Sequence, residues 1–289
     1  MKVLEGLYDI QIENPKLNEI PIPCHTELPK FFHLTTIYGS RGSGKTLALS
    51  NIIRMEAPFN THIYWFSPTV KNDHKVSTLL ADFQDKITYI EDFNKPNFLA
   101  VEQNIKDHIN QWKNKIRLSK LVRPLLKKGY DMEDIFLHLI ETGQIEYEDD
   151  IDLDIIDHTT EYLQSHKPIF SIIIDDELDS PLLTNRVKNP FNHFVSTHRH
   201  YFTNLYILIQ NYTSINNIIR RNAQEVLIFP TKDLKMLEFI FKEVAGLFPN
   251  GFEQFLEIMK EIEKTPYSFL FIDSNSKQLR KGLTDLIIL

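Results

Sequence analysis

The sequence predicts an α/β fold in which a central, mostly parallel sheet is flanked by helices. Strand-like and helix-like segments alternate along the chain, which is the pattern of this class. Several of the predicted strands are continuous apolar runs, as expected for strands buried on both faces of a parallel sheet. In addition, Gly39, Gly42 and Gly44 account for three of only 9 glycines and lie between a predicted strand and a predicted helix.

Composition supports a folded globular chain and excludes several other classes. The 289 residues have a mass of 34.0 kDa, and hydrophobic residues make up 42% and charged residues 25%. A net charge of −7 excludes a basic nucleic-acid coat but not a local basic lining. Cys24 is the only cysteine, which argues against a disulfide scaffold and favours the cytosol. The longest apolar runs, Ile172–Ile174 and Leu205–Ile209, are too short for a membrane span.

The elements follow one another in a regular order. Strands are predicted at 31–38, 61–67, 87–90, 169–174, 205–209, 226–229 and 268–272, and helices at 46–55, 233–244 and 252–262. Four prolines predict an extended arm over residues 1–30, ahead of one domain over 31–289. A polar helical insertion is predicted at about 94–166. Its first part, Lys106–Lys128, is basic, and its second part, Asp131–Asp157, is acidic.

The glycine cluster forms a phosphate-binding motif. The run Gly39-Ser40-Arg41-Gly42-Ser43-Gly44-Lys45-Thr46 matches G-x-x-x-x-G-K-[ST] without a mismatch. Glycines let the backbone N–H groups turn inward around phosphate oxygens, and the helix that follows presents its positive end. We therefore expect all eight residues to bind ATP, with Lys45 at the β- and γ-phosphates and Thr46 on Mg²⁺. The alternative is an ordinary glycine turn before a helix.

Three carboxylates follow an apolar strand at Asp175, Asp176 and Glu177. If this strand is parallel to the strand before the phosphate loop, its end lies beside the nucleotide. Asp175 is then expected to hold Mg²⁺, as in a Walker B motif, and Asp176 to activate the attacking water. Glu177 is the alternative base. The other interpretation of the cluster is a solvated acidic turn.

Further candidates lie later in the chain. Gln210 ends a predicted core strand and is placed to bond a water or the γ-phosphate, although a simple strand cap is the alternative. Arg220 and Arg221 precede the next strand, and either can act as an arginine finger toward a neighbouring subunit or belong to a solvated helix end. Arg199 offers another arginine for the same role.

Two further patterns are a histidine pair, considered as a metal site, and a basic stretch, considered as a DNA contact. His198 and His200 have no cysteine or third ligand nearby, which argues against a metal site. The basic stretch Lys106–Lys128 contains eight basic residues and one acid, Asp107, and is a candidate for contacts with DNA phosphates. Its alternative is an amphipathic helix with a solvated basic face, paired to the acidic stretch that follows.

The order of these motifs resembles a known family. The phosphate loop, the Asp175-Asp176 strand end, Arg199-His200 before a strand ending in Gln210, Ile219–Asn222 and the strand end at Asp273 are similar to the poxvirus-type genome-packaging ATPases. These enzymes occur in large eukaryotic DNA viruses, virophages and mobile elements, within the HerA–FtsK superfamily of P-loop NTPases. The matching parts span about Phe32 to Asp273, and the insertion matches only loosely.

The resemblance implies a RecA/HerA–FtsK-like ATPase that forms a hexameric or pentameric ring and threads double-stranded DNA into a capsid. It assigns Lys45 and Thr46 to nucleotide and Mg²⁺, Asp175 to the metal and Asp176 to the attacking water. Gln210 would sense the γ-phosphate, and Arg220 or Arg221 would enter the neighbour's site, a role for which Arg199 is the alternative. Capsid or portal-vertex proteins would be partners, and the viral factory of the host cytoplasm and the virion the locations.

Two other function classes share the phosphate loop. A small-molecule or nucleoside kinase would need an acceptor pocket and a basic lid, for which Arg117 and Arg123 are candidates. A nucleotide-bound assembly scaffold would bind ATP without hydrolysing it. The carboxylates at 175–177 fit the activation of a water better than they fit a kinase.

Overall fold

The computed structural model describes residues 2–4, 32–145, 159–175 and 180–289. These residues divide into two compact units. One unit contains residues 2–4, 32–102 and 169–289 and holds the sheet. The other contains the described part of 103–168 and is helical, and one long helix, α3, contributes residues to both.

The secondary structure alternates as predicted. The strands are β1 (Lys2–Leu4), β2 (Leu34–Tyr38), β3 (His62–Phe66), β4 (Ile87–Ile90), β5 (Phe170–Asp175), β6 (Thr203–Ile209), β7 (Glu225–Ile228), β8 (Leu270–Asp273), β9 (Gln278–Lys281) and β10 (Asp285–Ile288). The helices are α1 (Lys45–Glu56), α2 (His74–Leu79), α3 (Lys95–Lys127), α4 (Met132–Glu141), α6 (Thr160–Ser165), α7 (Pro181–Thr184), α8 (Pro190–Thr197), α9 (Asn217–Asn222), α10 (Leu234–Val244) and α11 (Gly251–Glu263). Short 3₁₀ turns occupy Val70–Asn72, Ala81–Lys86, His198–Tyr201 and Ala245–Leu247.

Each strand and helix predicted from the sequence is present within a few residues of its expected bounds. The short strands β9 and β10 and the short helices α2, α7, α8 and α9 are not predicted from the sequence. They are four to eight residues long and lack a sustained apolar period, so the sequence pattern carries little signal for them. The arm predicted for residues 1–30 lies outside the described residues, except for β1.

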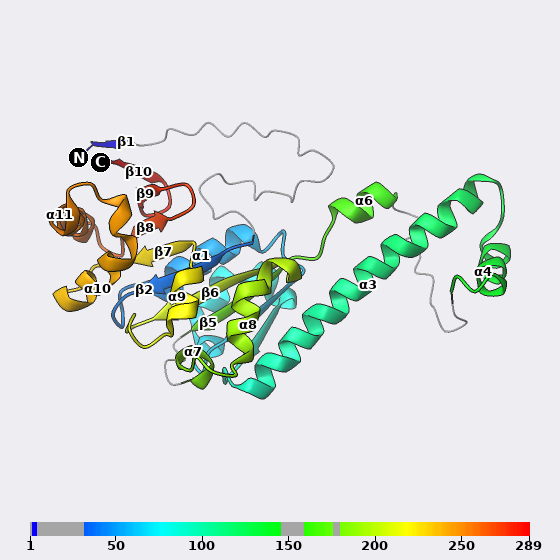
Figure 1. The fold of residues 1–289 in the computed structure, drawn as a ribbon, viewed down its shortest axis with the longest axis horizontal. Helices are drawn as coiled ribbons and strands as arrows, with labels where there is room; N and C mark the ends of the chain where they lie inside the picture. The colour runs from blue at the N-terminus through cyan, green and yellow to red at the C-terminus, as the bar shows by residue number, and fades with distance from the viewer. Residues whose placement is uncertain (1, 5–31, 146–158, 176–179) are drawn as a thin grey trace. The chain divides into compact units, whose positions relative to one another are not determined.

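The strands described form one sheet in the order β1-β10-β9-β8-β7-β2-β6-β5-β3-β4 (Figure 1). From β7 to β4 all neighbours pair in parallel, and from β7 back to β1 they pair antiparallel. Parallel strands end at the same edge, so the carboxyl ends of β2, β6 and β5 lie side by side there. In an open α/β sheet this is the edge where ligands bind.

Helices cover both faces of the parallel part of the sheet (Figure 1). On one face α1 buries Leu49, Ile52 and Ile53 against strand residues that alternate along the sheet: Ile37, Ile63, Trp65, Ile173, Leu208 and Leu227. On the other face Phe66 meets Phe93, whose ring centroid lies 5.0 Å from that of Phe191 in α8. The strands are therefore buried on both faces, as their continuous apolar runs predict.

The helical unit has its own small core. Leu118 and Val122 of α3 pack with Ile135 and Leu139 of α4. Trp112 of α3 donates its indole N–H to the backbone oxygen of Leu163 in α6 at 2.8 Å. These contacts bury the apolar side of α3, whereas its residues Lys113, Lys120 and Lys127 are exposed.

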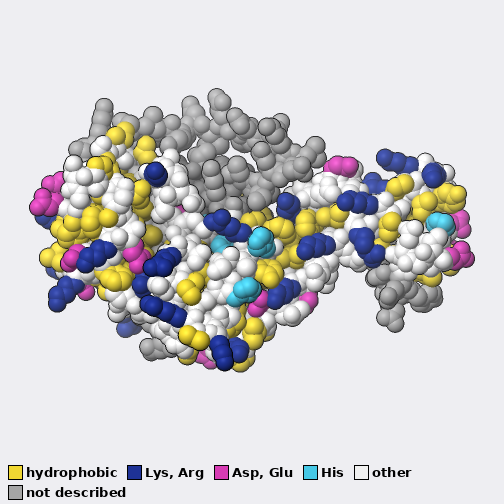
Figure 2. Space-filling view, in the orientation of Figure 1, with side chains coloured by type: hydrophobic (Ala, Val, Ile, Leu, Met, Phe, Trp, Pro, Cys, Tyr) yellow, Lys and Arg dark blue, Asp and Glu magenta, His cyan; other side chains and the backbone are white. Residues whose placement is uncertain are grey.

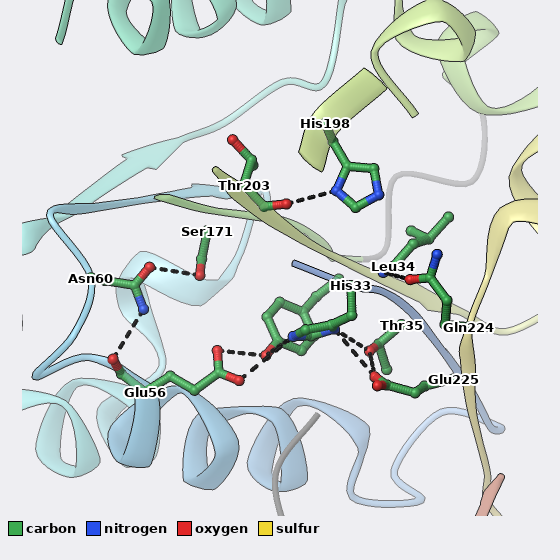
Figure 3. A network of polar contacts seen from close by, with 11 residues as sticks. His33, Leu34, Thr35, Glu56, Asn60, Ser171, His198, Thr203, Gln224 and Glu225 are labelled. Atoms are coloured by element: carbon green, nitrogen blue, oxygen red, sulfur yellow. Dashed lines mark hydrogen bonds and ion pairs between the residues drawn. The ribbon is translucent and has the colours of Figure 1, made fainter. Parts of the chain in front are cut away.

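A buried charge network lies at the sheet edge opposite the phosphate loop (Figure 3). His33, just before β2, has Nδ1 3.2 Å from Glu225 Oε2 and Nε2 3.6 Å from Glu56 Oε1. Tyr206 donates its hydroxyl to Glu56 at 2.6 Å. Burial by itself lowers the pKa of His33, but the charges and hydrogen bonds of Glu225 and Glu56 outweigh it and raise this pKa to about 9. His33 is therefore charged at neutral pH.

Replacing His33 by glutamine is expected to destabilise the fold in a pH-dependent way. The folded pKa of about 9 exceeds the unfolded value of 6.5, so the stabilisation is complete below pH 6.5 and is lost as pH rises through 9. A shift of this size corresponds to about 3 kcal/mol. Urea unfolding of wild type and His33→Gln at pH 6, 7.5 and 9 measures the difference, with the exposed His200→Gln as control. A difference that stays constant or grows with pH would contradict this account.

Candidate nucleotide-binding site

The predicted phosphate loop joins β2 to α1 at the carboxyl edge of the sheet. β2 ends at Tyr38 and α1 begins at Lys45, so the loop leads directly into a helix N-terminus. Gly44 caps the helix with φ 104°, a left-handed conformation that side-chain-bearing residues rarely adopt. The backbone N–H groups of the first helical turn have no partner within the helix and are available to an anion.

The beginning of the loop is closely packed. A Cβ on Gly39 would lie 2.5 Å from Ser43 Oγ and 2.8 Å from Phe229 Cβ, so glycine is required there. Ser43 Oγ is itself buried and has no hydrogen-bond partner in the part of the chain that the structure describes. A buried hydroxyl without a partner inside such a loop fits a ligand with acceptor oxygens, such as a phosphate.

Lys45 points back into the loop. Its Nζ donates to the backbone oxygens of Gly39 at 2.7 Å and Ser40 at 3.0 Å, and the residue is only 8% exposed. Burial of an ammonium group is costly unless it is compensated. The loop thus concentrates positive charge where phosphate oxygens would bind. Ser40 and Arg41 are exposed on the loop.

Thr46 and Asp175 meet although 129 positions separate them in the sequence. The Thr46 hydroxyl donates to Asp175 Oδ2 at 3.3 Å, and Asp175 is 6% exposed at the last position of β5. Both groups offer oxygen atoms, which are the ligands that Mg²⁺ prefers. The pair therefore fits Mg²⁺, with Thr46 and Asp175 as the residues that would hold it.

Gln210 lies between these two parts of the site. It follows β6, the strand inserted between β2 and β5. The preceding residue, Ile209, accepts a backbone hydrogen bond from Gly39 at 3.2 Å, and Leu208 is paired with Asp175. Gln210 is half-buried at this position. The topology thus brings Gln210 beside both the phosphate loop and the acidic strand end.

The two candidates for the catalytic base, Asp176 and Glu177, lie outside the described residues. The three arginines are described and lie elsewhere in the fold. Arg199 is exposed in the turn before β6, at the edge opposite the loop. Arg220 and Arg221 lie in the last turn of the short helix α9, just before β7.

Arg220 is held within its own chain. Its Nε donates to Glu243 Oε1 at 2.8 Å, and its guanidinium lies 5.1 Å from the ring centroid of Phe239. A second nitrogen donates to the Ile215 backbone oxygen. Arg221, by contrast, is exposed. The packing therefore favours Arg221 over Arg220 for any contact with a neighbouring subunit.

The histidine pair has no metal-site geometry. His198 Nδ1 bonds to the Thr203 backbone oxygen at 2.7 Å, and burial lowers the pKa of this histidine to about 4, so it is neutral. His200 is exposed. Among the residues described, no group of three or more His, Cys, Asp or Glu side chains is placed to hold a metal.

Two aromatic residues beside the loop were not found from the sequence. Phe229 follows β7 and is fully buried, whereas Tyr267 lies ahead of β8 and is 70% exposed. A Cβ on Gly44 would lie 3.2 Å from Tyr267 Cδ1 and 3.6 Å from Phe229 Cε1. The only sequence signal for Tyr267 is the Pro266 before it, which marks a turn.

Comparisons with known proteins give fold-level likenesses. No family model matches the sequence, and no curated protein matches it. Among solved structures, the genome-packaging NTPase B204 of Sulfolobus turreted icosahedral virus 2, in complex with AMPPCP, is 13% identical with a TM-score of 0.47, covering 87% of this chain and 97% of B204. The pCW3 conjugation coupling protein TcpA, in its ATPγS form, is 13% identical with a TM-score of 0.42, covering 83% of this chain and 56% of TcpA.

EssC (ATPases 2 and 3) from Geobacillus thermodenitrificans is 13% identical with a TM-score of 0.40, covering 88% of this chain and 38% of EssC. At these identities the likeness concerns the fold and not the activity. The α/β architecture itself is given by the sheet order and by the helices on both of its faces. None of the helices in the described ranges has an apolar stretch long enough to span a membrane.

Proposed function

We propose that this chain is an ATP-driven motor that translocates double-stranded DNA into a viral capsid. ATP hydrolysis is supported by the hydrogen bond between the Thr46 hydroxyl and Asp175 beside the phosphate loop. Walker-type NTPases place a loop hydroxyl and a strand-end carboxylate together in this way to hold Mg²⁺. The DNA part is supported by the order of motifs, which resembles the poxvirus-type packaging ATPases, and by a basic helix face.

Each residue of the site has a role in hydrolysis. Lys45 and the loop N–H groups bind the β- and γ-phosphates and neutralise charge that develops in the transition state. Thr46 and Asp175 would hold Mg²⁺, which would supply further charge neutralisation when bound. Asp176, or Glu177 in its place, accepts the proton of the attacking water, and Gln210 positions that water or senses the γ-phosphate.

The site is completed by a second subunit in a ring of six or five. An arginine from the neighbour, Arg221 or Arg199, reaches the γ-phosphate, while Arg220 supports α9 through Glu243. Ring assembly would make hydrolysis depend steeply on protein concentration. Such a motor would work in the viral factory of the host cytoplasm and in the virion, docked on capsid or portal-vertex proteins.

The DNA-facing surface is assigned to one face of α3. Lys113, Lys120 and Lys127 are exposed and repeat every seven residues, which places them within about 40° on a helix and over about 21 Å of its length. The sequence has no acidic residue from 108 to 130. In the described part of the chain these three lysines form no ion pair. Figure 2 shows basic side chains gathered along α3.

Replacing Lys113, Lys120 and Lys127 together by glutamine is expected to weaken DNA binding without changing DNA-independent hydrolysis. Each lost phosphate contact removes about one unit from the slope of log affinity against log salt, so the slope should fall by about 2 to 3. Fluorescence anisotropy with a linear duplex over a salt series measures this. The matched control replaces the exposed Lys71, Lys232 and Lys235. Equal slopes in both triple variants would remove α3 from the DNA surface.

Steady-state ATP hydrolysis with and without linear double-stranded DNA, over a range of protein concentrations, tests the function as a whole. We expect the rate per subunit to rise with DNA and to rise with concentration. When Arg221→Ala subunits are mixed with wild type, the rate of ATP hydrolysis should fall by more than the fraction of wild-type subunits lost, because each variant subunit also disables its neighbour's site. Hydrolysis indifferent to DNA and to concentration would overturn the motor. Phosphate transfer to a nucleoside would instead indicate a kinase, and tight ATP binding without turnover would indicate an assembly scaffold.

A further inference from the structure

Tyr267 is an unusual residue for its place in the fold. It is 70% exposed, although it lies against the phosphate loop, and its φ is 59°. A bulky residue in the left-handed region is rare, since its Cβ approaches the backbone there. Glycine would occupy this position without that cost. The ring is thus held at the surface beside the loop by a backbone conformation that is unfavourable for tyrosine.

The layout of the site gives a direction to a bound nucleotide. Thr46 and Asp175 mark the end where the terminal phosphate and Mg²⁺ would lie, on the side of β2 that faces β6 and β5. The nucleoside must then leave the loop on the other side of β2, toward β7 and β8. Tyr267 lies on that side, because β8, which begins three residues after it, pairs with β7.

A second aromatic residue, the buried Phe229, lies beside the same glycine of the loop as Tyr267. Phe229 donates its backbone N–H to the Tyr38 oxygen at 2.8 Å, so its position is tied to the end of β2. Its ring centroid lies 5.1 Å from that of Phe269, which is also buried. A Cβ on Gly44 would contact both Phe229 and Tyr267, so the two rings lie against one side of the loop. Of the two, only Tyr267 presents its ring to solvent.

We propose that the ring of Tyr267 is the platform on which the base of the bound nucleotide stacks. An exposed aromatic face beside the exit of a phosphate site offers the π-surface that a nucleobase needs. This inference rests on the proposed function, since it takes the loop to bind a nucleoside triphosphate. The stack anchors the base, while the loop anchors the phosphates.

The test compares ATP with inorganic tripolyphosphate, which has the phosphates but no base. Isothermal titration of the full chain gives the affinity for each ligand. Tyr267→Gly is expected to weaken ATP binding about 10-fold or more, to leave tripolyphosphate binding unchanged and to leave thermal stability no lower. Tyr267→Phe keeps the ring and should bind ATP as wild type does. Tyr130→Ala, which removes another exposed tyrosine, is the matched control.

Two results would overturn the stacking platform. ATP binding unchanged in Tyr267→Gly would show that the base does not use this ring. Equal weakening of ATP and tripolyphosphate would show that Tyr267 acts on the shape of the loop through Gly44. A wild-type chain that binds neither ligand would overturn the nucleotide site as well. A Tyr267 effect confined to ATP, in a chain whose hydrolysis ignores DNA, would retain the platform and reject the motor.

Discussion

Lys45→Ala is expected to lower ATP hydrolysis by at least about 100-fold. Lys45 brings the only side-chain charge of the loop that is both buried and directed at its backbone carbonyls. Without it, charge that develops on the phosphate oxygens during hydrolysis has only the backbone N–H groups to stabilise it. Release of phosphate from ATP, measured at saturating nucleotide and Mg²⁺, reports the loss directly.

The control for Lys45 must separate chemistry from folding. Lys71→Ala removes an exposed lysine and should keep full activity. Thermal unfolding of Lys45→Ala, measured beside wild type, shows whether lost activity comes from lost chemistry or from lost folding, since Lys45 is buried and bonds to two loop carbonyls. A folded Lys45→Ala chain with full hydrolysis would show that the phosphate loop is not the catalytic site.

Asp175→Asn is expected to lower ATP hydrolysis about as much as Lys45→Ala does, but by weakening the binding of Mg²⁺. Asparagine keeps the shape of the side chain and its contact with Thr46 but removes the charge that a divalent cation requires. The rate at saturating Mg²⁺ should fall by at least about 100-fold, and the Mg²⁺ concentration for half-maximal rate should rise. Removing a buried negative charge should not weaken ATP binding in the absence of Mg²⁺, because it lessens repulsion of the phosphates.

The exposed Asp85→Asn is the matched control and should leave both quantities unchanged. The informative result is a reduced rate of hydrolysis together with unchanged ATP binding in the absence of Mg²⁺. If Asp175→Asn weakened metal-free ATP binding and hydrolysis equally, Asp175 would be supporting the loop and not the cation. An unchanged Mg²⁺ dependence would contradict the metal role outright.

The phosphate loop could be predicted from the sequence because its signal is local. Gly39, Gly42 and Gly44 with Lys45 and Thr46 lie within eight positions, and Gly42 and Gly44 have the positive φ that favours glycine. The buried strands were predictable for a related reason, since burial on both faces leaves a continuous apolar run. The α/β class followed from the alternation of such runs with helices.

The tertiary structure decided which of the later residues meet. Strand order is set by pairing between distant segments, and no local pattern states that β6 enters between β2 and β5. That order places Gln210 beside the loop and Asp175 3.3 Å from Thr46. Packing likewise joined Arg220 to Glu243 and set Tyr267 against Gly44. Residue type in the sequence cannot distinguish a paired arginine from an exposed one, or a buried aromatic ring from an exposed one, because partner and burial are properties of the folded chain.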